Sequence, residues 1–548
     1  MRTTSARTGS ARTGSGWKTG TVLLAVGLLA VSACTSESTK SAPTGSTTGT
    51  TPAGPADLTA ALVAIENQPK YNSSDWGYIA IDQKTGEVLA AQNPDKMFDP
   101  GSTMKSFSVS AALKAYGNDY KFTTPVYRAG SVSGDTLTGN LVLVGSGDLS
   151  FGLREQPNGT LYYENFPALD HSYANIGAPG AVEPPGDPLG VLDQYAQKVK
   201  AAGITKVNGD VVIDDRLFTP IKWPDGLVSP IWINENLIDI EVSPGSAAGQ
   251  PSTIDWRPKT ASYTVETQAT TVDAKESPEL EAKETTPGHI VVKGKIPAGS
   301  KPVLTVQEIT DPSAFARTAF IEALQRAGVT VTATPTGPNP ASLLPAKDSY
   351  QAGDKLAEHT SATIAAYVQL IMKVSYNRGA DLMACLAAVK SGSTDCEQGL
   401  VAEVDNFTSL GVSKDAAYPF DGAGSNDQSR SSPRALATFY KNATATPYAQ
   451  ALFDSLPIVG KDGTMANVLP DSPLAGKAQI KTGNRGVGTP AGQSILLGNS
   501  LAGYVLAKSG RQFTVMIAMG NMPFNSFAEF ETVTSDQAKM LAAMQQAF

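Results

Sequence analysis

The stretch PGSTMKSFSVSAALKAY, residues 100–116, combines a Pro-Gly break with a run that contains neither breaker. Apolar side chains recur through this run, which predicts a buried helix starting at Ser102, a good N-cap residue type. Lys105 lies three residues later on the same helix face. Its amine could take the proton of the Ser102 hydroxyl if burial or a nearby cation lowers the lysine pKa. A random Ser-x-x-Lys is more often an N-cap followed by a solvated lysine.

Patterns at both ends of the chain predict one shared sheet. Residues 76–90 alternate between apolar and polar side chains around a turn that contains Gly, which is typical of a β-hairpin. Near the C-terminus, residues 501–506 and 513–519 form a second hairpin pattern around a Lys-Ser-Gly turn, and a helix follows over 535–547. We therefore expect strands from the two ends to pair.

The middle of the chain is richer in Gly, Pro and short strand-like runs, from about residue 126 to 345. Strands are predicted over 137–144 and 209–214, a small β unit over 253–296, and helices over 313–327 and 361–390. This texture predicts an α+β fold. A domain of helices and antiparallel sheet, formed by residues 57–128 and 346–548, is divided by a largely β insertion.

Composition narrows the class of protein. The 548 residues suffice for two or three domains, and the net charge of -8 argues against a nucleic-acid partner, because such binders concentrate Lys and Arg. His171, His289 and His359 show no ligand cluster, so we expect no metal and no cofactor. Cys385 and Cys396 are close in sequence, and the sequence permits either a disulfide or two buried thiols.

The N-terminal segment predicts export. Residues 1–33 place Arg and Lys before a short apolar run, which is typical of a secretory signal. The residues VSAC, 31–34, resemble a bacterial lipobox, in which Cys34 would be lipidated; an ordinary cleaved signal is the alternative. Residues 34–56 are nearly all Ser, Thr, Pro, Gly and Ala, which predicts a disordered tether. We expect a body that is lipid-anchored to the outer face of the cytoplasmic membrane.

Two further motifs suit a Ser-Lys site. Ser375-Tyr376-Asn377 ends a helical segment, where a second Ser could relay a proton and an Asn amide could hold a substrate carbonyl. Lys481-Thr482-Gly483 follows a strand-like segment, and its Gly allows a substrate backbone to approach. The tripeptide alone proves little, because it also occurs at residues 84–86 and 18–20. The order of the three motifs matches the penicillin-recognising serine enzymes.

Other segments resemble, in order, the low-molecular-mass class C penicillin-binding proteins, which are the D-alanyl-D-alanine carboxypeptidase/endopeptidases of peptidase family S13. These segments are GSGD (145–148), DDRLF (214–218), LAEHTS (356–361), DGAG (421–424) and LPIVGKDGT (456–464). The resemblance covers about residues 57–548. It implies a split transpeptidase-like catalytic domain over 57–128 and 346–548. The implied inserted domains are domain II over 129–245 and 303–345, and a small β domain III over 246–302.

The resemblance also implies a mechanism. Ser102 would be acylated by a peptidoglycan stem peptide, with Lys105 as base and Lys481 helping to keep that base neutral. Ser375 would pass the proton to the leaving group, and Asn377 would orient the substrate. The oxyanion hole would be formed by the backbone N–H groups of Ser102 and Asn484, and β-lactam antibiotics would be trapped as the same acyl-enzyme. The residues expected to bind substrate are Thr482, Gly483, Asn484, Arg485, Asp148, Asp421 and Arg430.

Two departures from the family pattern concern substrate recognition. Asn484-Arg485 follows Lys-Thr-Gly where Thr or Ser is usual, and a polar, Gly-rich stretch over 486–500 is expected before the closing hairpin. Arg485 could bind a carboxylate or point to solvent. After DGAG the chain has Ser-Asn-Asp where Leu-Ser-Arg is usual, with Arg430 three residues beyond Asp427. A non-catalytic, wall-binding lipoprotein of the same fold is therefore the alternative, and a β-lactamase is less compatible because no deacylating base can be placed.

Overall fold

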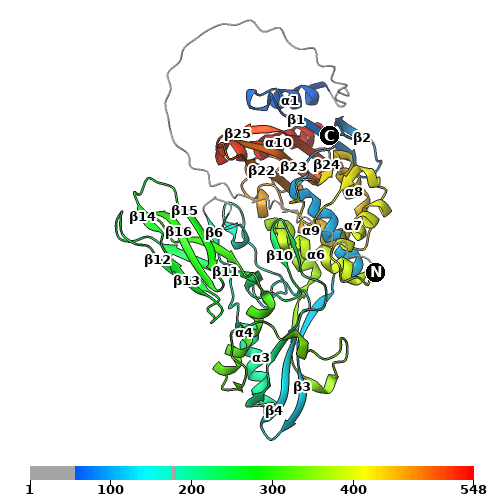
Figure 1. Ribbon diagram of the computed structural model, residues 1–548. Coiled ribbons are helices and arrows are strands. Elements are labelled where there is room, and N and C mark those ends of the chain that lie inside the picture. Colours follow the sequence, from blue (N-terminus) through cyan, green and yellow to red (C-terminus); the bar gives the residue numbers. More distant parts are fainter. Residues whose placement is uncertain (1–55, 176–179) are drawn as a thin grey trace, which may run out of the picture.

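The computed structural model describes residues 56–175 and 180–548 (Figure 1). The predicted signal segment and Cys34 lie outside the described residues, as does the predicted tether except for Ala56. Ala56 is the first residue of helix α1 (Ala56–Glu66), which the sequence patterns did not predict. In the part of the chain that is described, no helix combines the length and apolar character needed to cross a membrane.

One sheet is built from both ends of the chain, which confirms the predicted pairing. Its strand order is β2-β1-β24-β23-β22, and β25 pairs with β23. The antiparallel register places Tyr78 opposite Ile517 and Gly483 opposite Ser500. The strands are β1 (Asp75–Asp82), β2 (Val88–Gln92), β22 (Ala478–Gly488), β23 (Ser494–Leu506), β24 (Gln512–Gly520) and β25 (Met522–Phe524).

The expectation that residues 486–500 precede the hairpin is wrong. Gly488 pairs with Ser494, so this polar stretch forms the far end of a long β22–β23 hairpin. Backbone pairing does not require apolar side chains, which is why the hydrophobic pattern ended too early. The C-terminal helix is likewise longer than predicted, because α10 spans Phe527–Ala547.

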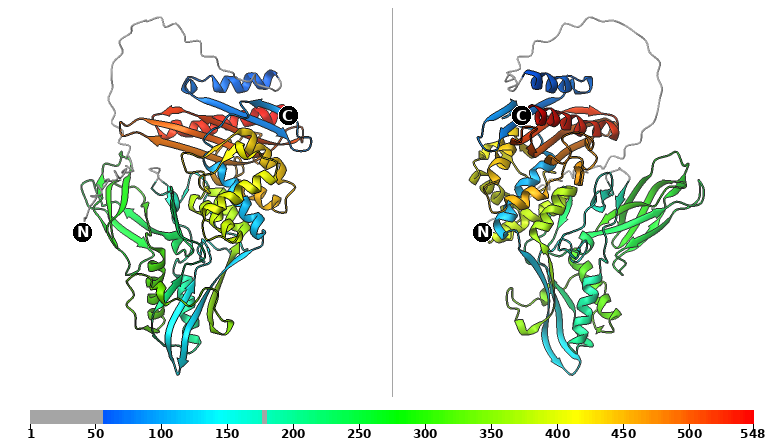
Figure 2. Two further views of the ribbon diagram at one scale, coloured as in Figure 1. Left: turned by 45° about the vertical axis from the view of Figure 1, so that its right-hand side comes forward. Right: turned by 180° about the vertical axis from the view of Figure 1, so that it is seen from behind.

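The two faces of the sheet bury different helices, as Figure 2 shows. Val515 and Ile517 belong to the core that includes α1 and α10, whereas Met516 and Ala518 belong to the core of the other helices. This alternation follows from the period of two along a strand. The helices of the second face are α2 (Lys105–Tyr116), α5 (Ile364–Val374), α6 (Asn377–Lys390), α7 (Glu397–Ser409), α8 (Pro433–Ala443) and α9 (Ala449–Ser455).

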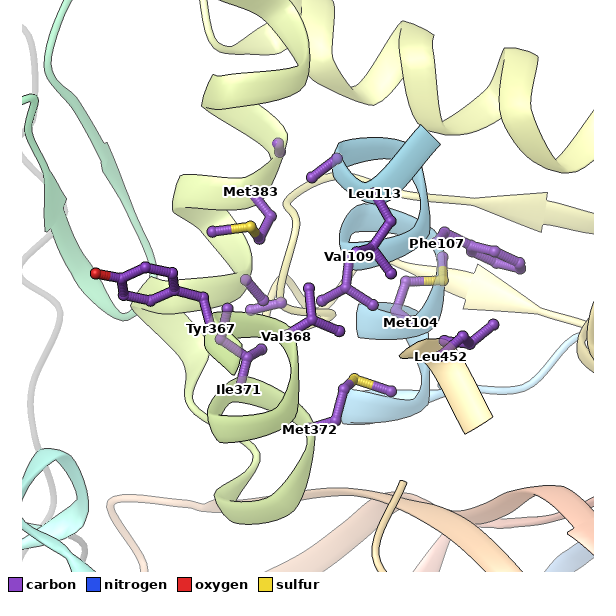
Figure 3. Close-up of a cluster of buried hydrophobic side chains, with 14 of the residues drawn as sticks. Met104, Phe107, Val109, Leu113, Tyr367, Val368, Ile371, Met372, Met383 and Leu452 are labelled. Atoms are coloured by element: carbon purple, nitrogen blue, oxygen red, sulfur yellow. The ribbon is translucent and has the colours of Figure 1, made fainter. Parts of the chain in front are cut away.

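Helix α2 lies inside this second core (Figure 3). Phe107 and Val109 of this helix and Met104 just before it are fully buried. Met104 and Val109 lie beside side chains of α5 and α9, including Met372 and Leu452, whereas Phe107 packs on Phe407 of α7 and Phe439 of α8. A disulfide joins Cys385 of α6 to Cys396 at the start of α7, which settles the alternative that the sequence left open. The helical pattern predicted over 361–390 is divided, because strand β19 continues to Thr363 and Ser375 separates α5 from α6.

The inserted region carries a second core. Its main sheet has the order β18-β7-β4-β3-β19, with β8 beside β4, and is covered by α3 (Gly190–Ala201) and α4 (Pro312–Arg326). The strands are β3 (Lys121–Ser133), β4 (Thr136–Val144), β7 (Lys206–Asn208), β8 (Val211–Asp214), β18 (Thr330–Val331) and β19 (Lys355–Thr363). The predicted strands at 137–144 and 209–214 and the helix at 313–327 are thus present within two residues of their expected bounds.

Two smaller sheets complete the insertion. Strands β11 (Leu237–Ser243), β12 (Thr253–Arg257) and β17 (Val303–Glu308) form one, and β13 (Thr264–Thr267), β14 (Thr270–Val272), β15 (Glu279–Thr286) and β16 (His289–Pro297) form the other. The predicted β unit over 253–296 is therefore shared between two sheets. Short pairs are β5 (Leu169–Asp170) with β6 (Ala181–Val182), β9 (Ile221–Trp223) with β10 (Gly226–Val228), and β20 (Ala417–Tyr418) with β21 (Arg430–Ser431).

Candidate active site

The turn that carries Ser102 differs from the expected helix start. Gly101–Met104 form a 3-10 turn, and α2 begins only at Lys105, so Ser102 is not its N-cap. Gly101 has φ +48, and a Cβ at this position would lie 2.6 Å from the backbone nitrogen of Asn484. Only Gly can adopt this conformation and admit strand β22 so closely. The close packing of the turn against the strand therefore sets its geometry.

Ser500, which is far from the turn in sequence, helps to hold it through polar contacts with Pro100 and Thr103. The Ser500 hydroxyl donates to the Pro100 carbonyl at 2.7 Å, and the Thr103 hydroxyl lies 3.3 Å from the Ser500 hydroxyl. Thr103 and Ser500 are fully buried, whereas Ser102 between them is half-buried. Ser102 is thus the side chain of this rigid turn that solvent or a ligand can reach.

Lys105 is fully buried and makes three polar contacts. Its Nζ lies 2.7 Å from Ser102 Oγ, 2.6 Å from Asn377 Oδ1 and 2.9 Å from the Ala423 carbonyl oxygen. A neutral amine has two N–H groups, which suffice for Asn377 and Ala423. Its lone pair then faces Ser102 Oγ, which is the geometry that proton removal from the hydroxyl needs.

Burial makes the neutral form of this lysine more accessible than in an exposed lysine. Burial lowers the pKa of Lys105 to about 8, against the attraction of Asp225, Asp381 and Asp421. Burial also lowers the pKa of Lys481 well below its ordinary value, and the charge of Lys105 adds to this shift. Two buried cations close together disfavour each other's protonation.

The other two motifs meet at the same place. Lys481 Nζ donates to Ser375 Oγ at 2.8 Å and to the Thr482 carbonyl at 2.7 Å. Ser375 has φ +64, a left-handed conformation that ends α5 and turns the chain into α6, whose first residue is Asn377. The structure therefore brings together the five residues that the three motifs predicted, Ser102, Lys105, Ser375, Asn377 and Lys481.

Two further residues at this site come from the insertion and were missed. Asp225, between β9 and β10, accepts a hydrogen bond from Asn377 Nδ2 at 2.7 Å, which orients Oδ1 toward Lys105. Tyr173 donates its phenol proton to the Ser375 carbonyl and lies 3.2 Å from Asn377 Oδ1. Neither residue lies near a catalytic motif in sequence, so no local pattern could have indicated them.

The residues predicted to bind substrate occupy different positions. Thr482 contacts Thr464 at 3.0 Å, and Gly483 and Asn484 pack against the Ser102 turn. Asp421 is fully buried and accepts from the backbone of Gly424 and Ser425, so it shapes the loop whose Ala423 carbonyl holds Lys105.

Arg485 binds a carboxylate, as one alternative had it, but this carboxylate belongs to the protein itself. Its Nε donates to Asp99 at 2.7 Å and its Nη2 to the Gly424 carbonyl at 2.6 Å. Arg430 is exposed and bonds to backbone carbonyls of its own loop.

Asp148 is not brought to Ser102. It is buried, accepts from the backbone of Phe151 and from the Tyr367 hydroxyl, and forms an ion pair with His359 at 3.5 Å. Burial raises the pKa of Asp148, against the effect of His359. These contacts lie within the junction of the insertion and the helices.

A buried cluster of charges surrounds His171. Its Nδ1 lies 2.8 Å from Asp239 and its Nε2 3.0 Å from Glu235. Within the described ranges, Asp170, His171 and Glu235 bring their ligand-type atoms within 4.8 Å of one another, so the expectation that no His joins such a group is wrong for His171. Arg154 already binds Asp170 and Glu235, which makes the group an ion-pair network.

Comparisons with known proteins agree with this arrangement. The family model described as D-Ala-D-Ala carboxypeptidase 3 (S13) family matches residues 58–543. A D-alanyl-D-alanine carboxypeptidase of Actinomadura sp. (strain R39) is 25% identical over 472 residues, covering 82% of this chain and 78% of that protein. The D-alanyl-D-alanine carboxypeptidase DacB of Haemophilus influenzae is 23% identical over 442 residues, covering 76% and 82%.

The fold also matches solved structures. Penicillin-binding protein 4 (dacB) of Haemophilus influenzae superposes with a TM-score of 0.66 at 20% identity, covering 88% of this chain and 99% of that chain. Its complex with a novel β-lactam gives a TM-score of 0.63 at 20% identity, covering 89% and 99%. These matches confirm the α+β fold with several sheets and helices.

Proposed function

The chain belongs to the D-Ala-D-Ala carboxypeptidase 3 (S13) family, and on that premise we propose that it is a serine D,D-peptidase that forms an acyl-enzyme on Ser102. The family consists of serine peptidases, so the chain is a hydrolase. Its proposed substrates are peptidoglycan stem peptides, cleaved at a D-Ala-D-Ala terminus or at a D-Ala cross-link. The observation that carries the proposal is the fully buried Lys105 amine, 2.7 Å from Ser102 Oγ.

The acylation step follows from the contacts. Neutral Lys105 takes the proton of Ser102, and Oγ attacks the carbonyl carbon of the penultimate D-Ala. The oxyanion is stabilised by the backbone N–H groups of Ser102 and Asn484, which adjoin in the packed turn. The amide C–N bond then breaks, and the leaving nitrogen receives a proton through Ser375, whose hydroxyl contacts Lys481.

Deacylation returns the enzyme to its starting state. Water gives a proton to neutral Lys105 and attacks the ester carbonyl, and the C–O bond to Ser102 then breaks as Lys105 returns the proton to Oγ, which releases the shortened peptide. A β-lactam would acylate Ser102 in the same way, but its leaving nitrogen stays tethered to the acyl group. The structure of Haemophilus influenzae penicillin-binding protein 4 in complex with a novel β-lactam, whose fold this chain shares, supports this expectation.

Incubation with a fluorescent penicillin, followed by denaturing electrophoresis, tests the proposal. We expect stable label on the wild type and none on Ser102→Ala. A folded wild type that takes no label would indicate a non-catalytic wall-binding protein, and rapid loss of label would indicate a β-lactamase. Release of D-Ala from a pentapeptide, compared with cleavage of a cross-linked dimer, separates carboxypeptidase from endopeptidase activity.

Export and a lipid anchor at Cys34 are part of the same proposal. They rest on the sequence of residues 1–34, which ends in the lipobox-like VSAC. The test is metabolic labelling with a fatty acid in a bacterial host, combined with membrane fractionation. Cys34→Ser should abolish the label and release the protein from the membrane, and a labelled Cys34→Ser variant would overturn the assignment.

A further inference from the structure

A segment of the insertion, Asn165–Asn175, contacts two loops that adjoin the catalytic groups, one at Gly463 and one at Ser375–Asn377; we call this segment the strap. At its start, the Asn165 side chain accepts from the Gly463 backbone at 2.7 Å, and the Phe166 N–H donates to the Gly463 carbonyl at 3.2 Å. Gly463 precedes Thr464, which contacts Thr482 of the Lys-Thr-Gly strand. Near its end, Tyr173 reaches the Ser375–Asn377 loop.

The strap is fixed on its other side by the ion-pair network. Asp170 pairs with Arg154 at 2.7 Å, and His171 lies between Glu235 and Asp239. The group holds three cations, Arg154, His171 and the partly buried Arg257, and four carboxylates, Asp170, Glu235, Asp239 and Glu183. Asn175 adds contacts to the backbone and side chain of β17.

The backbone that supplies Glu235 is strained. Asn234, Glu235 and Asn236 all have positive φ, at 51°, 53° and 56°. Non-glycine residues rarely adopt this conformation, so three in succession persist only where the surroundings determine them. The side chains of Asn234 and Asn236 bond to the chain on both sides, and Arg378, which follows Asn377 in α6, donates to the Glu235 carbonyl at 2.8 Å.

We propose that Tyr173 is a positioning residue for the acylation step, acting on Lys105 through Asn377. Its single phenol proton is shared between two acceptors: the Ser375 carbonyl, which is the closer, and Asn377 Oδ1 at 3.2 Å, the oxygen that also accepts from Lys105. This proposal rests on the serine peptidase function proposed above. It assigns the insertion a direct part in the chemistry of the split domain.

The orientation of the Tyr173 O–H dipole determines how Tyr173 affects the protonation of Lys105. Its positive end lies between the Ser375 carbonyl and Oδ1, and the share that reaches Oδ1 opposes the attraction between this oxygen and a charged Lys105 ammonium. Without the phenol, Oδ1 would be a better acceptor for the ammonium, so the protonated form of the base would be favoured. Burial, then Asp225, raises the pKa of Tyr173, so the phenol keeps its proton and remains a donor.

The other charges around Lys105 act independently of Tyr173. The groups that face it are Asp225, Asp381 and Asp421, which favour the ammonium, and Arg485 and Lys481, which disfavour it. Asp381 of α6 is buried and lacks a hydrogen-bonding side-chain partner in the described residues, and burial raises its pKa well above the ordinary value. Tyr173 therefore shifts the equilibrium between the charged and neutral forms of Lys105, to which three carboxylates also contribute.

The test compares Tyr173→Phe with Tyr162→Phe. Tyr162 also lies in the insertion and bonds to a carboxylate, that of Glu164, without contacting the catalytic loops. We expect Tyr173→Phe to slow acylation by fluorescent penicillin about 10- to 100-fold, as small displacements of catalytic groups do. We also expect the acidic limb of its pH–rate profile to shift to higher pH by about half a unit. At pH values below the limb, this shift lowers the acylation rate by about a further threefold. Tyr162→Phe should match the wild type.

A second variant covers the case in which Tyr173→Phe fails to fold. Incorporation of 3,5-difluorotyrosine at position 173 keeps the ring and strengthens the O–H donor, so the acidic limb should move to lower pH. An unchanged limb in both variants, or a rate loss that is equal at all pH values, would overturn the positioning role while the label on the wild type upholds the peptidase. A wild type without label would overturn the peptidase function, and this inference with it.

Discussion

Two buried charge clusters lie on either side of Asn377, and they respond to burial in opposite ways. On one side, Lys105 and Lys481 contact amide, hydroxyl and carbonyl groups, with no carboxylate among the described residues that contact them, and burial lowers both pKa values. On the other side, Arg154 and His171 are equally buried, and carboxylates bind them directly. Their partners outweigh burial and raise the pKa of His171 to about 10.

In these two clusters the direct partners decide the direction of the pKa shift, because the cations are similarly buried. Lys105 and Lys481 have no direct counterion among the described residues, and their pKa values fall. His171 is bound by two carboxylates and keeps its charge. On the proposed function, the same fold would use buried cations for the chemistry at Ser102 and for anchoring the strap.

Substitution of Lys105, the proposed base, should have the largest effect on the acylation rate. We expect Lys105→Gln to slow acylation by fluorescent penicillin at least about 1000-fold, because the hydroxyl loses its proton acceptor while the neutral side chain fills the site. The melting temperature should change little. Lys114→Gln, an exposed position of the same helix, is the matched control and should acylate like the wild type. Equal labelling of both variants would show that Lys105 is not the base.

Disruption of the ion-pair network around Arg154 and His171 should lower the stability of the protein. Glu235→Gln removes the carboxylate that Arg154 and His171 share, and we expect the free energy of unfolding of the insertion to fall by about 3–5 kcal/mol. Urea unfolding followed by tryptophan fluorescence measures it. Lys96→Gln, in an exposed pair with Asp75, is the control and should cost less than about 1 kcal/mol. Equal losses in both variants would contradict the distinction between buried and exposed pairs.

The pH dependence of acylation sharpens the comparison further. The pKa of Lys105 is lowered to about 8, so the neutral base predominates above this pH and falls tenfold per unit below it. We expect the acylation rate constant to be about 100-fold lower at pH 6 than on the plateau above pH 8. Rapid-quench labelling across pH 6–9, corrected for spontaneous penicillin hydrolysis, measures the profile. A flat profile would mean that Lys105 is neutral throughout, or is not the base.

Much of this arrangement could be predicted from local sequence. Each of the three motifs is a short run of neighbouring residues that can be recognised locally. From the order of the motifs we predicted that five residues share one site: Ser102, Lys105, Ser375, Asn377 and Lys481. Alternating patterns also predicted that strands from the two ends of the chain would pair. These features are predictable because each follows from the spacing of residues within a short segment, either the helical spacing or the period of two in a strand.

What the sequence could not predict depends on contacts between distant segments. Tyr173 and Asp225 reach Asn377 because the insertion folds back, and no spacing along the chain encodes that approach. Arg485 binds Asp99, 386 residues away, so the choice between substrate and solvent could not include its actual partner. Ser102 lies in a 3-10 turn because strand β22 packs against Gly101, and helix propensity takes no account of such packing.

The contact between Thr103 and Ser500 has a consequence for the order of synthesis. A ribosome delivers Ser102 and Lys105 early, whereas β22 and β23 emerge only near the end of the chain, 397 residues later for this contact. The nucleophile and its base therefore exist as a covalent motif long before a strand edge is available to shape the turn. Until the last strands join the sheet, the emerging polypeptide carries the parts of a hydrolase without its activity, and any shortened product that lacks them should remain inert.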